Sequence, residues 1–164
     1  MESNFHNPQI TRLGNRSVRT CLELAARTFG TNSPYFQAVH HFMEEKRAGY
    51  VAKIRNYVVG FIIYDSRDVD VTQILALAVR KQHWREGIGS QLLNRVVRLP
   101  RKEIITHVDE WFLETQLFLR SQGFRAVAIE RGTPEYYVFK RSGMNVASSI
   151  TEVKPFFQAA GVTS

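Results

Sequence analysis

The stretch Leu75-Ala76-Leu77-Ala78-Val79, followed by REGIGS at residues 85–90 and QLL at 91–93, decides the fold of this chain. It consists of an apolar strand, a short turn with two glycines and the start of an amphipathic helix. The first N–H groups of a helix have no partner within the helix, and the helix dipole favours negative charge beside them. The stretch therefore predicts a site for a pyrophosphate, which glycines at 87 and 89 let approach the backbone closely.

The glycine spacing differs from that of the two common nucleotide-binding loops. The dinucleotide motif G-x-G-x-x-G needs a third glycine where this sequence has Leu92, and the ATP-binding loop needs a lysine directly after its last glycine. A tight strand-to-helix connection can also contain two glycines without binding any ligand. The surrounding sequence must therefore decide between these interpretations.

Composition indicates one packed domain of 164 residues, with 44% apolar and 12% aromatic residues. The apolar run at 74–79 is too short to cross a bilayer, and residues 1–4 do not resemble a signal peptide, so we expect a cytoplasmic location and no membrane partner. Cys21 is the single cysteine, which excludes an internal disulfide and a cysteine zinc site. It lies on an apolar helix face and is expected to be a small core residue.

The net charge of +7 comes from 22 basic and 15 acidic residues, and it suits an acidic ligand or a nucleic-acid neighbour. The basic residues are scattered, however, with no run longer than pairs such as Arg80-Lys81. Neither the aromatic and basic interleaving of an RNA-binding sheet nor zinc-finger spacing is present. Direct nucleic-acid binding is therefore not expected as the primary function.

Apolar periodicity predicts strands and helices in the order β-α-α-β-β-β-α-β-α-β-β. Asn15 and Ser33 are expected to cap the first two helices, and Asp109 the last one, whose apolar face would carry Leu113, Leu117 and Phe118. We expect a single domain at 1–142. The remaining residues, 143–164, predict a tail that is either flexible or weakly docked.

The central block resembles the Gcn5-related N-acetyltransferase (GNAT) family. Its pattern is an apolar strand ending in valine, a basic linker and [Gln/Arg]-x-x-Gly-x-[Gly/Ala] at the start of a helix with Leu-Leu. The residues in register are Val79, Gly87, Ile88, Gly89, Leu92 and Leu93, whereas Trp84 replaces the usual Gln or Arg. A second block, residues 116–124, follows at the expected distance. The resemblance covers about residues 8–142 and looks nearest to the ribosomal-protein N-terminal alanine acetyltransferases.

This resemblance implies an α/β (α+β) fold with a mixed central sheet of about six to seven strands and helices on both faces. It also implies acetyl-CoA as co-substrate, no metal, and direct transfer of the acetyl group to an amine. The acceptor would be a small molecule or a protein N-terminus, with a ribosomal protein among the candidates. The oligomeric state stays open.

The family also implies which backbone groups bind the cofactor. The strand end would hold the pantetheine arm and polarise the thioester carbonyl, while the turn would hold the pyrophosphate. The residues concerned are Leu77, Ala78 and Val79 in the strand, and Arg85, Glu86, Gly87, Ile88, Gly89 and Ser90 in the turn. The side chains of Arg80, Lys81 and Arg85 either add charge against the phosphates or are solvated surface cations.

The positions that carry acid and base in the nearest relatives differ in this sequence. Counting back from Gly123, the base glutamate is replaced by His107, the coenzyme-binding asparagine by Phe112 and the tyrosine acid by Leu119. An imidazole titrates near pH 6.5 and can accept an ammonium proton through water, so His107 is a candidate base. Alternatively, it is a strand-end histidine that is bonded to the backbone.

Other residues could replace the missing groups. Tyr136 or Tyr137 is a candidate acid, but strand alternation lets only one of them face the site. Glu130 and Glu135 are alternative bases, and the aromatic side chains at 35 and 36 are candidate acceptor contacts. Two further hypotheses are a catalytically weak acyl-CoA-binding or regulatory module and a ribosome- or RNA-associated protein.

Overall fold

The computed structural model describes residues 7–45 and 48–143, which form a seven-stranded mixed sheet with two pairs of α-helices. The elements are β1 (Gln9–Arg12), α1 (Asn15–Phe29), α2 (Pro34–Glu45), β2 (Ala48–Ile54), β3 (Tyr57–Asp65), β4 (Val71–Val79), the 3₁₀ turn η1 (Lys81–His83), α3 (Ile88–Val97), β5 (Glu103–Asp109), α4 (Leu113–Ser121), β6 (Arg125–Glu130) and β7 (Tyr136–Ser142). This order and the mixed sheet confirm the predicted fold class. Apart from Gly143, the predicted tail lies outside the described residues.

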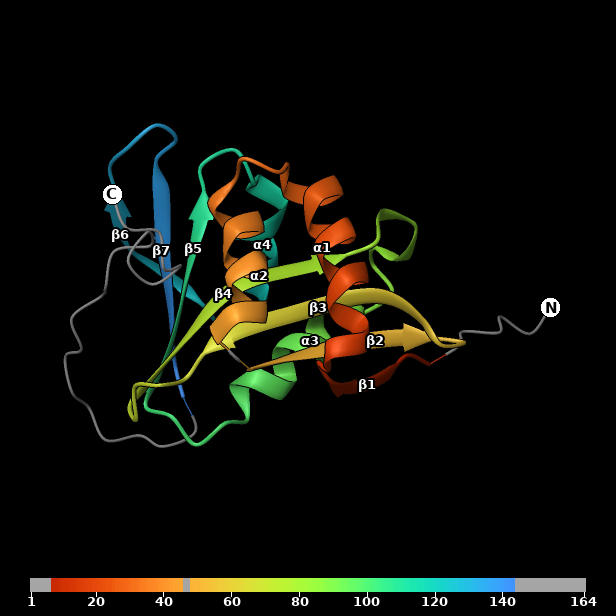
Figure 1. Cartoon of the computed structure of the whole chain (residues 1–164). Helices are drawn as coiled ribbons and strands as arrows, with labels where there is room; N and C mark the ends of the chain where they lie inside the picture. Colours follow the sequence, from red (N-terminus) through yellow and green to blue (C-terminus); the bar gives the residue numbers. More distant parts are fainter. Residues whose placement is uncertain (1–6, 46–47, 144–164) are drawn as a thin grey trace.

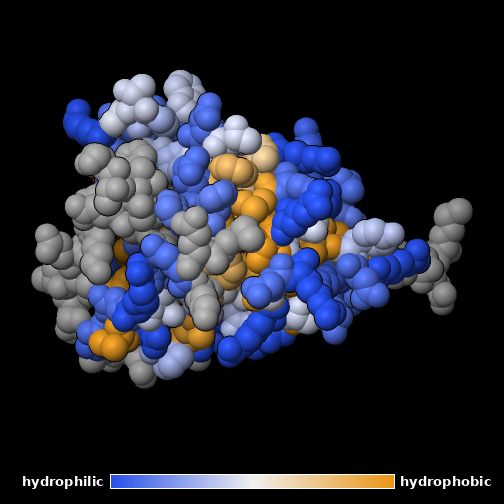
Figure 2. All heavy atoms as spheres, viewed as in Figure 1, coloured by the Kyte–Doolittle hydropathy of each residue, from blue (hydrophilic) through white to orange (hydrophobic). Residues whose placement is uncertain are grey.

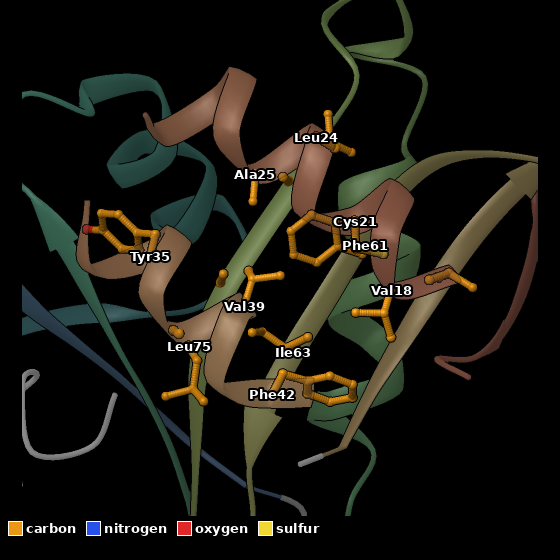
Figure 3. Packing of buried hydrophobic residues seen from close by; sticks show 14 of the residues in the cluster. Val18, Cys21, Leu24, Ala25, Tyr35, Val39, Phe42, Phe61, Ile63 and Leu75 are labelled. Carbon is orange, nitrogen blue, oxygen red and sulfur yellow. The ribbon is translucent and has the colours of Figure 1, made fainter. Parts of the chain in front are cut away.

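The strands are ordered β1-β2-β3-β4-β5-β7-β6, and every neighbouring pair is antiparallel except β4 and β5. Helices α1 and α2 cover one face of the sheet, and the opposite face carries α3 and α4 (Figure 1). Figure 3 shows the first of the two cores, where residues of α1 and α2 pack onto β3 and β4. Cys21 is completely buried there, as expected, and burial raises the pKa of its thiol to about 12.

Strands β4 and β5 separate halfway along their length, and this divergence positions the site. They pair only from Val71 with Glu103 to Ile74 with Thr106, after which the two strands move apart (Figure 1). At the same point β4 contains a bulge against β3, because Tyr64 pairs with Ile74 whereas Ile63 pairs with Ala76. A bulge bends its strand and increases the local twist. We call the opening between residues 75–79 of β4 and 107–109 of β5 the splay.

The start of α4 differs from the prediction. The helix begins at Leu113, and Asp109 instead accepts a hydrogen bond from the Trp111 N–H at 2.9 Å, which closes a turn before the helix. Leu113 and Leu117 are 61% and 58% exposed, while Leu119 is buried at 3%. The predicted inward positions of Leu113 and Leu117 were therefore wrong, because the turn at Asp109 delays the helix and directs a different face to the sheet.

The capping predictions for the first two helices have different outcomes. Ser33 caps α2, since its Oγ accepts a hydrogen bond from the Phe36 N–H at 3.1 Å. Asn15 is instead the first residue of α1, and Gly14 occupies the cap position without a side-chain hydrogen bond. Among the described residues, no helix is both long and apolar enough to cross a membrane.

Candidate active site

The glycine turn connects the end of β4 to α3 through two left-handed residues. Gly87 precedes the helix with φ +77°, and Arg85 has φ +64°. The Gly87 carbonyl accepts the hydrogen bond of Gln91 N–H at 3.0 Å, so the helix starts directly after it. Since a side chain is disfavoured at positive φ, the backbone conformation favours glycine at 87.

The two glycines have different surroundings. A Cβ at Gly87 would meet no atom within 4 Å, so the backbone faces open space at the helix N-terminus. A Cβ at Gly89 would lie 3.5 Å from the Phe118 ring, which is an ordinary contact. Position 89 therefore tolerates alanine, whereas position 87 offers bare backbone to a ligand. The expected pyrophosphate site fits this geometry.

Side chains of the turn bond mainly to the protein itself. The Trp84 indole N–H donates to the Val79 carbonyl at 2.8 Å, which ties the turn to the end of β4. His83 Nδ1 lies 2.9 Å from a carboxylate oxygen of Glu86. The Arg80 Nε–H donates to a β3 carbonyl at 2.8 Å, so this guanidinium is held against the sheet. The protein itself thus holds the side chains of Trp84, His83 and Arg80.

One arm of the splay presents backbone groups. Leu77, Ala78 and Val79 pair with β3 on one side, and their other edge faces the opening beyond the last pairing with β5. Buried backbone groups require hydrogen-bonding partners. The pantetheine arm of the cofactor, which contains amide groups, is a suitable partner, and the residues present therefore fit coenzyme A.

The other arm carries ionisable side chains on the face covered by α1 and α2. Strand register places Asp109 of β5 opposite Tyr136 of β7, and Tyr136 opposite Glu130 of β6. His107, two residues before Asp109, shares this face. Its Nε2 lies 3.2 Å from Oε2 of Glu130, and its Nδ1 lies 3.4 Å from the Gln73 amide nitrogen. Four strands therefore bring these side chains together.

His107 is buried, with only 2% of its surface exposed. Burial lowers the pKa of His107 to about 4, because water no longer solvates the charged imidazolium. The ring is therefore neutral at physiological pH, even with the Glu130 carboxylate beside it. Because the Gln73 amide nitrogen can only donate, its contact with Nδ1 at 3.4 Å places the ring proton on Nε2, the nitrogen that lies 3.2 Å from Glu130 Oε2.

The two candidate tyrosines lie on opposite faces of the sheet. Tyr136 is 3% exposed and belongs to the face of His107. Burial, with smaller contributions from Asp109 and Glu130, raises the pKa of Tyr136 to about 12, so its hydroxyl stays protonated. Tyr137 packs instead against the core beneath α3 and α4. The structure brings only Tyr136 together with His107.

Two further positions, which carry an asparagine and a tyrosine in the nearest relatives, hold Phe112 and Leu119 in this chain and serve packing. Phe112 joins the rings of Phe29 and Tyr35, at centroid distances of 6.3 and 5.9 Å, and Leu119 is buried. The Tyr35 hydroxyl donates to the His107 carbonyl at 3.3 Å and accepts from the Asp109 N–H at 2.8 Å. Tyr35, expected as an acceptor contact, thus ties α2 to the splay.

The surface over α1 and α2 is partly apolar. Figure 2 shows an apolar surface over α1 and α2, surrounded by hydrophilic residues. Phe29 and Phe36 are among the half-buried side chains that pack against the core of this face. This surface lies on the same side of the sheet as His107.

Two functional candidates differ in how visible they are in the sequence. Gln73 was missed, and its only signal is a polar residue in the otherwise apolar strand VTQILALAV. Glu130 was an alternative base, and only the strand pairing shows its contact with His107. Glu135, the other alternative, lies in the turn before β7, where its backbone pairs with Glu110.

Within the described residues, no group of three or more His, Cys, Asp or Glu side chains is arranged to hold a metal ion.

Comparison with protein families identifies the class. The model of the acetyltransferase (GNAT) family matches residues 16–124, so the chain belongs to this family of acetyltransferases. No curated protein matches the sequence.

Solved structures share the fold at low sequence identity. Ard1 from Thermoplasma volcanium has a TM-score of 0.73 and 20% identity, with 85% of this chain and 99% of that chain covered. The ribosomal-protein-S18-alanine N-acetyltransferase from Escherichia coli has a TM-score of 0.73 and 14% identity, covering 89% and 99%. A GNAT family acetyltransferase from Elizabethkingia anophelis with acetyl-CoA bound has a TM-score of 0.71 and 16% identity, covering 83% and 98%.

Proposed function

We propose that this protein is an acetyl-CoA-dependent N-acetyltransferase that transfers the acetyl group directly to an amine. The observation that carries the proposal is the splay between β4 and β5, whose β4 arm ends beside the open glycine turn. This places the strand edge beyond the β5 pairing and the helix N-terminus in one continuous path, as a ligand with amides at one end and phosphates at the other requires. The family match and the relative with bound acetyl-CoA support the same cofactor.

The cofactor residues of the proposal are those expected from the sequence. The backbone of Leu77, Ala78 and Val79 would hold the pantetheine arm. The backbone of residues 85–90 would hold the pyrophosphate, with the dipole of α3 favouring its charge. Bound acetyl-CoA supplies an acetyl group activated as a thioester.

We assign the proton transfers to the β5–β7–β6 face. Attack on the thioester requires a neutral amine, and the departing thiolate gains from a proton. Tyr136 is the proposed acid, because its hydroxyl stays protonated and shares the face with His107. Tyr137 is the weaker of the two candidates, since it faces the opposite core. His107 belongs to the proposed proton pathway.

The proposed acceptor is an amine of low basicity, of which a protein N-terminus is the main example. An α-amine titrates near pH 8 and is partly neutral at physiological pH, whereas a lysine side chain titrates near 10.4. A neutral buried histidine is a weak aid for deprotonating lysine. The Escherichia coli relative, by its name, acts on the alanine of a ribosomal protein, which makes ribosomal proteins one acceptor class to test.

The proposal can be tested with acetyl-CoA and a panel of acceptors. The panel contains peptides with free N-termini, including that of a ribosomal protein, matched peptides with a blocked N-terminus and one lysine, and small amines. We expect thiol release with free N-terminal peptides and little with the blocked ones. Absence of thiol release with every acceptor would contradict the proposal.

A second candidate function is a catalytically weak acyl-CoA-binding module. The observation favouring it is that two of the three polar positions of the relatives, now Phe112 and Leu119, serve packing, while His107 is buried. In that case acetyl-CoA should raise the melting temperature without any turnover. Measuring both quantities on the same preparation separates the two functions.

A further inference from the structure

The structure assigns a catalytic role to a residue outside the positions used by the relatives. We propose that Glu130 is the general base of the acetyl transfer and that His107 is a positioning residue that holds its carboxylate. This inference rests on the proposed acetyltransferase function and deepens it. It is carried by the contact between Glu130 Oε2 and His107 Nε2 at 3.2 Å, together with the different exposure of the two side chains.

Exposure separates the roles of the two residues. The His107 side chain has no exposed area, whereas 27% of the Glu130 side chain is exposed. A general base must come within hydrogen-bond reach of the proton that it accepts, directly or through one water. An incoming ammonium can reach Glu130 without moving the sheet, but it cannot reach the imidazole.

The contacts of His107 orient Glu130. Gln73 contacts Nδ1 from β4, and Tyr35 from α2 donates to the His107 carbonyl, so neighbouring elements fix both the ring and its backbone. With the ring proton on Nε2, the nitrogen that lies 3.2 Å from Glu130 Oε2 carries a proton, which favours the carboxylate in that position. A neutral donor fixes the carboxylate without neutralising its charge.

The charge pattern around Glu130 suits proton uptake. The titratable groups on the same face of the sheet include His107 and Asp109 on β5 and Tyr136 on β7. Of these, Asp109 is acidic, and His107 and Tyr136 are neutral at physiological pH. An ammonium group approaching this face is therefore attracted by two carboxylates and meets no fixed positive charge among these partners.

The proposed reaction balances without a further reactant. The acceptor ammonium gives one proton to a carboxylate oxygen of Glu130 through water. The neutral nitrogen then forms the C–N bond with the thioester carbonyl carbon, the C–S bond breaks and coenzyme A leaves as a thiolate. The sulfur takes the proton of the Tyr136 hydroxyl, the second proton of the nitrogen restores that hydroxyl, and Glu130 returns its proton to solvent. The products are an amide and a free thiol.

The test compares Glu130→Gln, Glu130→Asp and His107→Gln with the wild type, using the acceptor with the highest turnover. For Glu130→Gln we expect kcat to fall by about 10²–10³ at pH 7, with an unchanged Kd for acetyl-CoA. Raising the pH should recover much of this loss, because the acceptor then loses its proton to solvent. Glu130→Asp should lose roughly tenfold, because it keeps the charge but shortens the side chain.

His107→Gln should lower kcat by roughly tenfold and keep the limb of the pH profile that reports ionisation of the general base. This limb should persist if His107 only positions Glu130, and it should disappear if His107 is itself the base. Glu23→Gln on α1, whose side chain is exposed, serves as the matched charge control and should retain wild-type kcat. Melting temperatures check the folding of each variant. If Glu130→Gln does not fold, Glu130→Asp carries the comparison.

Two results would overturn the inference. One is full kcat in Glu130→Gln together with loss of the base limb in His107→Gln, which would make His107 the base. The other is a wild type that binds acetyl-CoA but acetylates no acceptor, which would remove the proposed function and the role of Glu130 together. If the wild type turns over and Glu130→Gln has an unchanged kcat, only the assignment of Glu130 as the base is refuted. The proposed acetyltransferase function is then unaffected.

Discussion

The glycine turn and the acid–base face of the splay use different parts of the chain for their chemistry. The turn relies on backbone: Gly87 adopts a left-handed conformation and faces open space before α3. The acid–base face relies on side chains, with His107, Glu130 and Tyr136 contributed by three strands. The first region follows the family pattern except at Trp84, whereas the acid and base positions of the nearest relatives differ at all three places.

This difference shows how each kind of site tolerates sequence change. A backbone site needs only a conformation, which two glycines at fixed spacing specify locally. A side-chain site needs functional groups at one place, and different strands can supply them. The turn can therefore keep the family pattern while the chemistry moves, in our proposal to a carboxylate at the end of β6.

The largest expected effect concerns the backbone region. Gly87→Val should abolish detectable acetyl-CoA binding, because a β-branched residue disfavours φ +77° and its side chain would occupy the open space before the helix. Isothermal titration calorimetry with acetyl-CoA measures this. Near-wild-type affinity in a folded Gly87→Val protein would refute the assignment of the pyrophosphate to the turn.

The next effect concerns His107 and the pH dependence of stability. The unfolded histidine takes up a proton below about pH 6.5, whereas the folded one stays neutral until about pH 4. The free energy of unfolding should therefore fall as the pH decreases through this window, by up to about 1.4 kcal/mol per pH unit from this group.

Urea titrations of the wild type and His107→Gln between pH 7 and 4 measure that contribution. The variant should show a shallower slope, since glutamine does not titrate. Equal slopes in the two proteins would show that the histidine does not stay neutral on acidification.

A smaller effect is expected at Trp84, which replaces the usual Gln or Arg. Trp84→Ala removes the hydrogen bond to the Val79 carbonyl, which contributes about 1 kcal/mol, so the Kd for acetyl-CoA should rise by about fivefold. Trp84→Phe, which keeps an aromatic ring without the N–H, isolates the hydrogen bond. If Trp84→Ala lost acetyl-CoA binding as completely as Gly87→Val, side chains and not the backbone would determine the affinity of the turn for the cofactor.

The smallest effect is expected for Gly89→Ala. The added methyl group would lie in ordinary contact with the Phe118 ring at 3.5 Å, and the melting temperature and the Kd for acetyl-CoA should stay near wild type. A strong loss of affinity would show that a ligand approaches position 89 more closely than the turn geometry indicates.

The sequence predicted the element order and the glycine turn well because both depend on local signals. Apolar periodicity and turn residues lie within a few positions of the elements that they specify. The orientation of α4 was not predicted. The sequence favours a helix that starts after Asp109, but Asp109 forms a turn, the helix starts at Leu113, and Leu119 packs against the sheet.

The acid–base face was only partly predictable for the same reason. Glu130 and His107 are 23 residues apart in the sequence, and only the insertion of β7 between β5 and β6 brings them to 3.2 Å. No local pattern encodes that contact. The choice between Tyr136 and Tyr137 likewise needed the strand register, because it decides which side chain faces His107.

The hydrogen bond of Trp84 also has a spectroscopic consequence. The chain contains two tryptophans, and the indole of Trp84 is 47% exposed and anchored to the last residue of β4. Indole emission depends on solvent contact, so a ligand that covers the turn should shift the emission of Trp84 to shorter wavelength. With Trp111→Phe as background, Trp84 becomes the single tryptophan, and excitation at the red edge of indole absorption avoids the six tyrosines. The residue that departs from the family pattern thus gives the protein an intrinsic optical signal for occupancy of the proposed cofactor site.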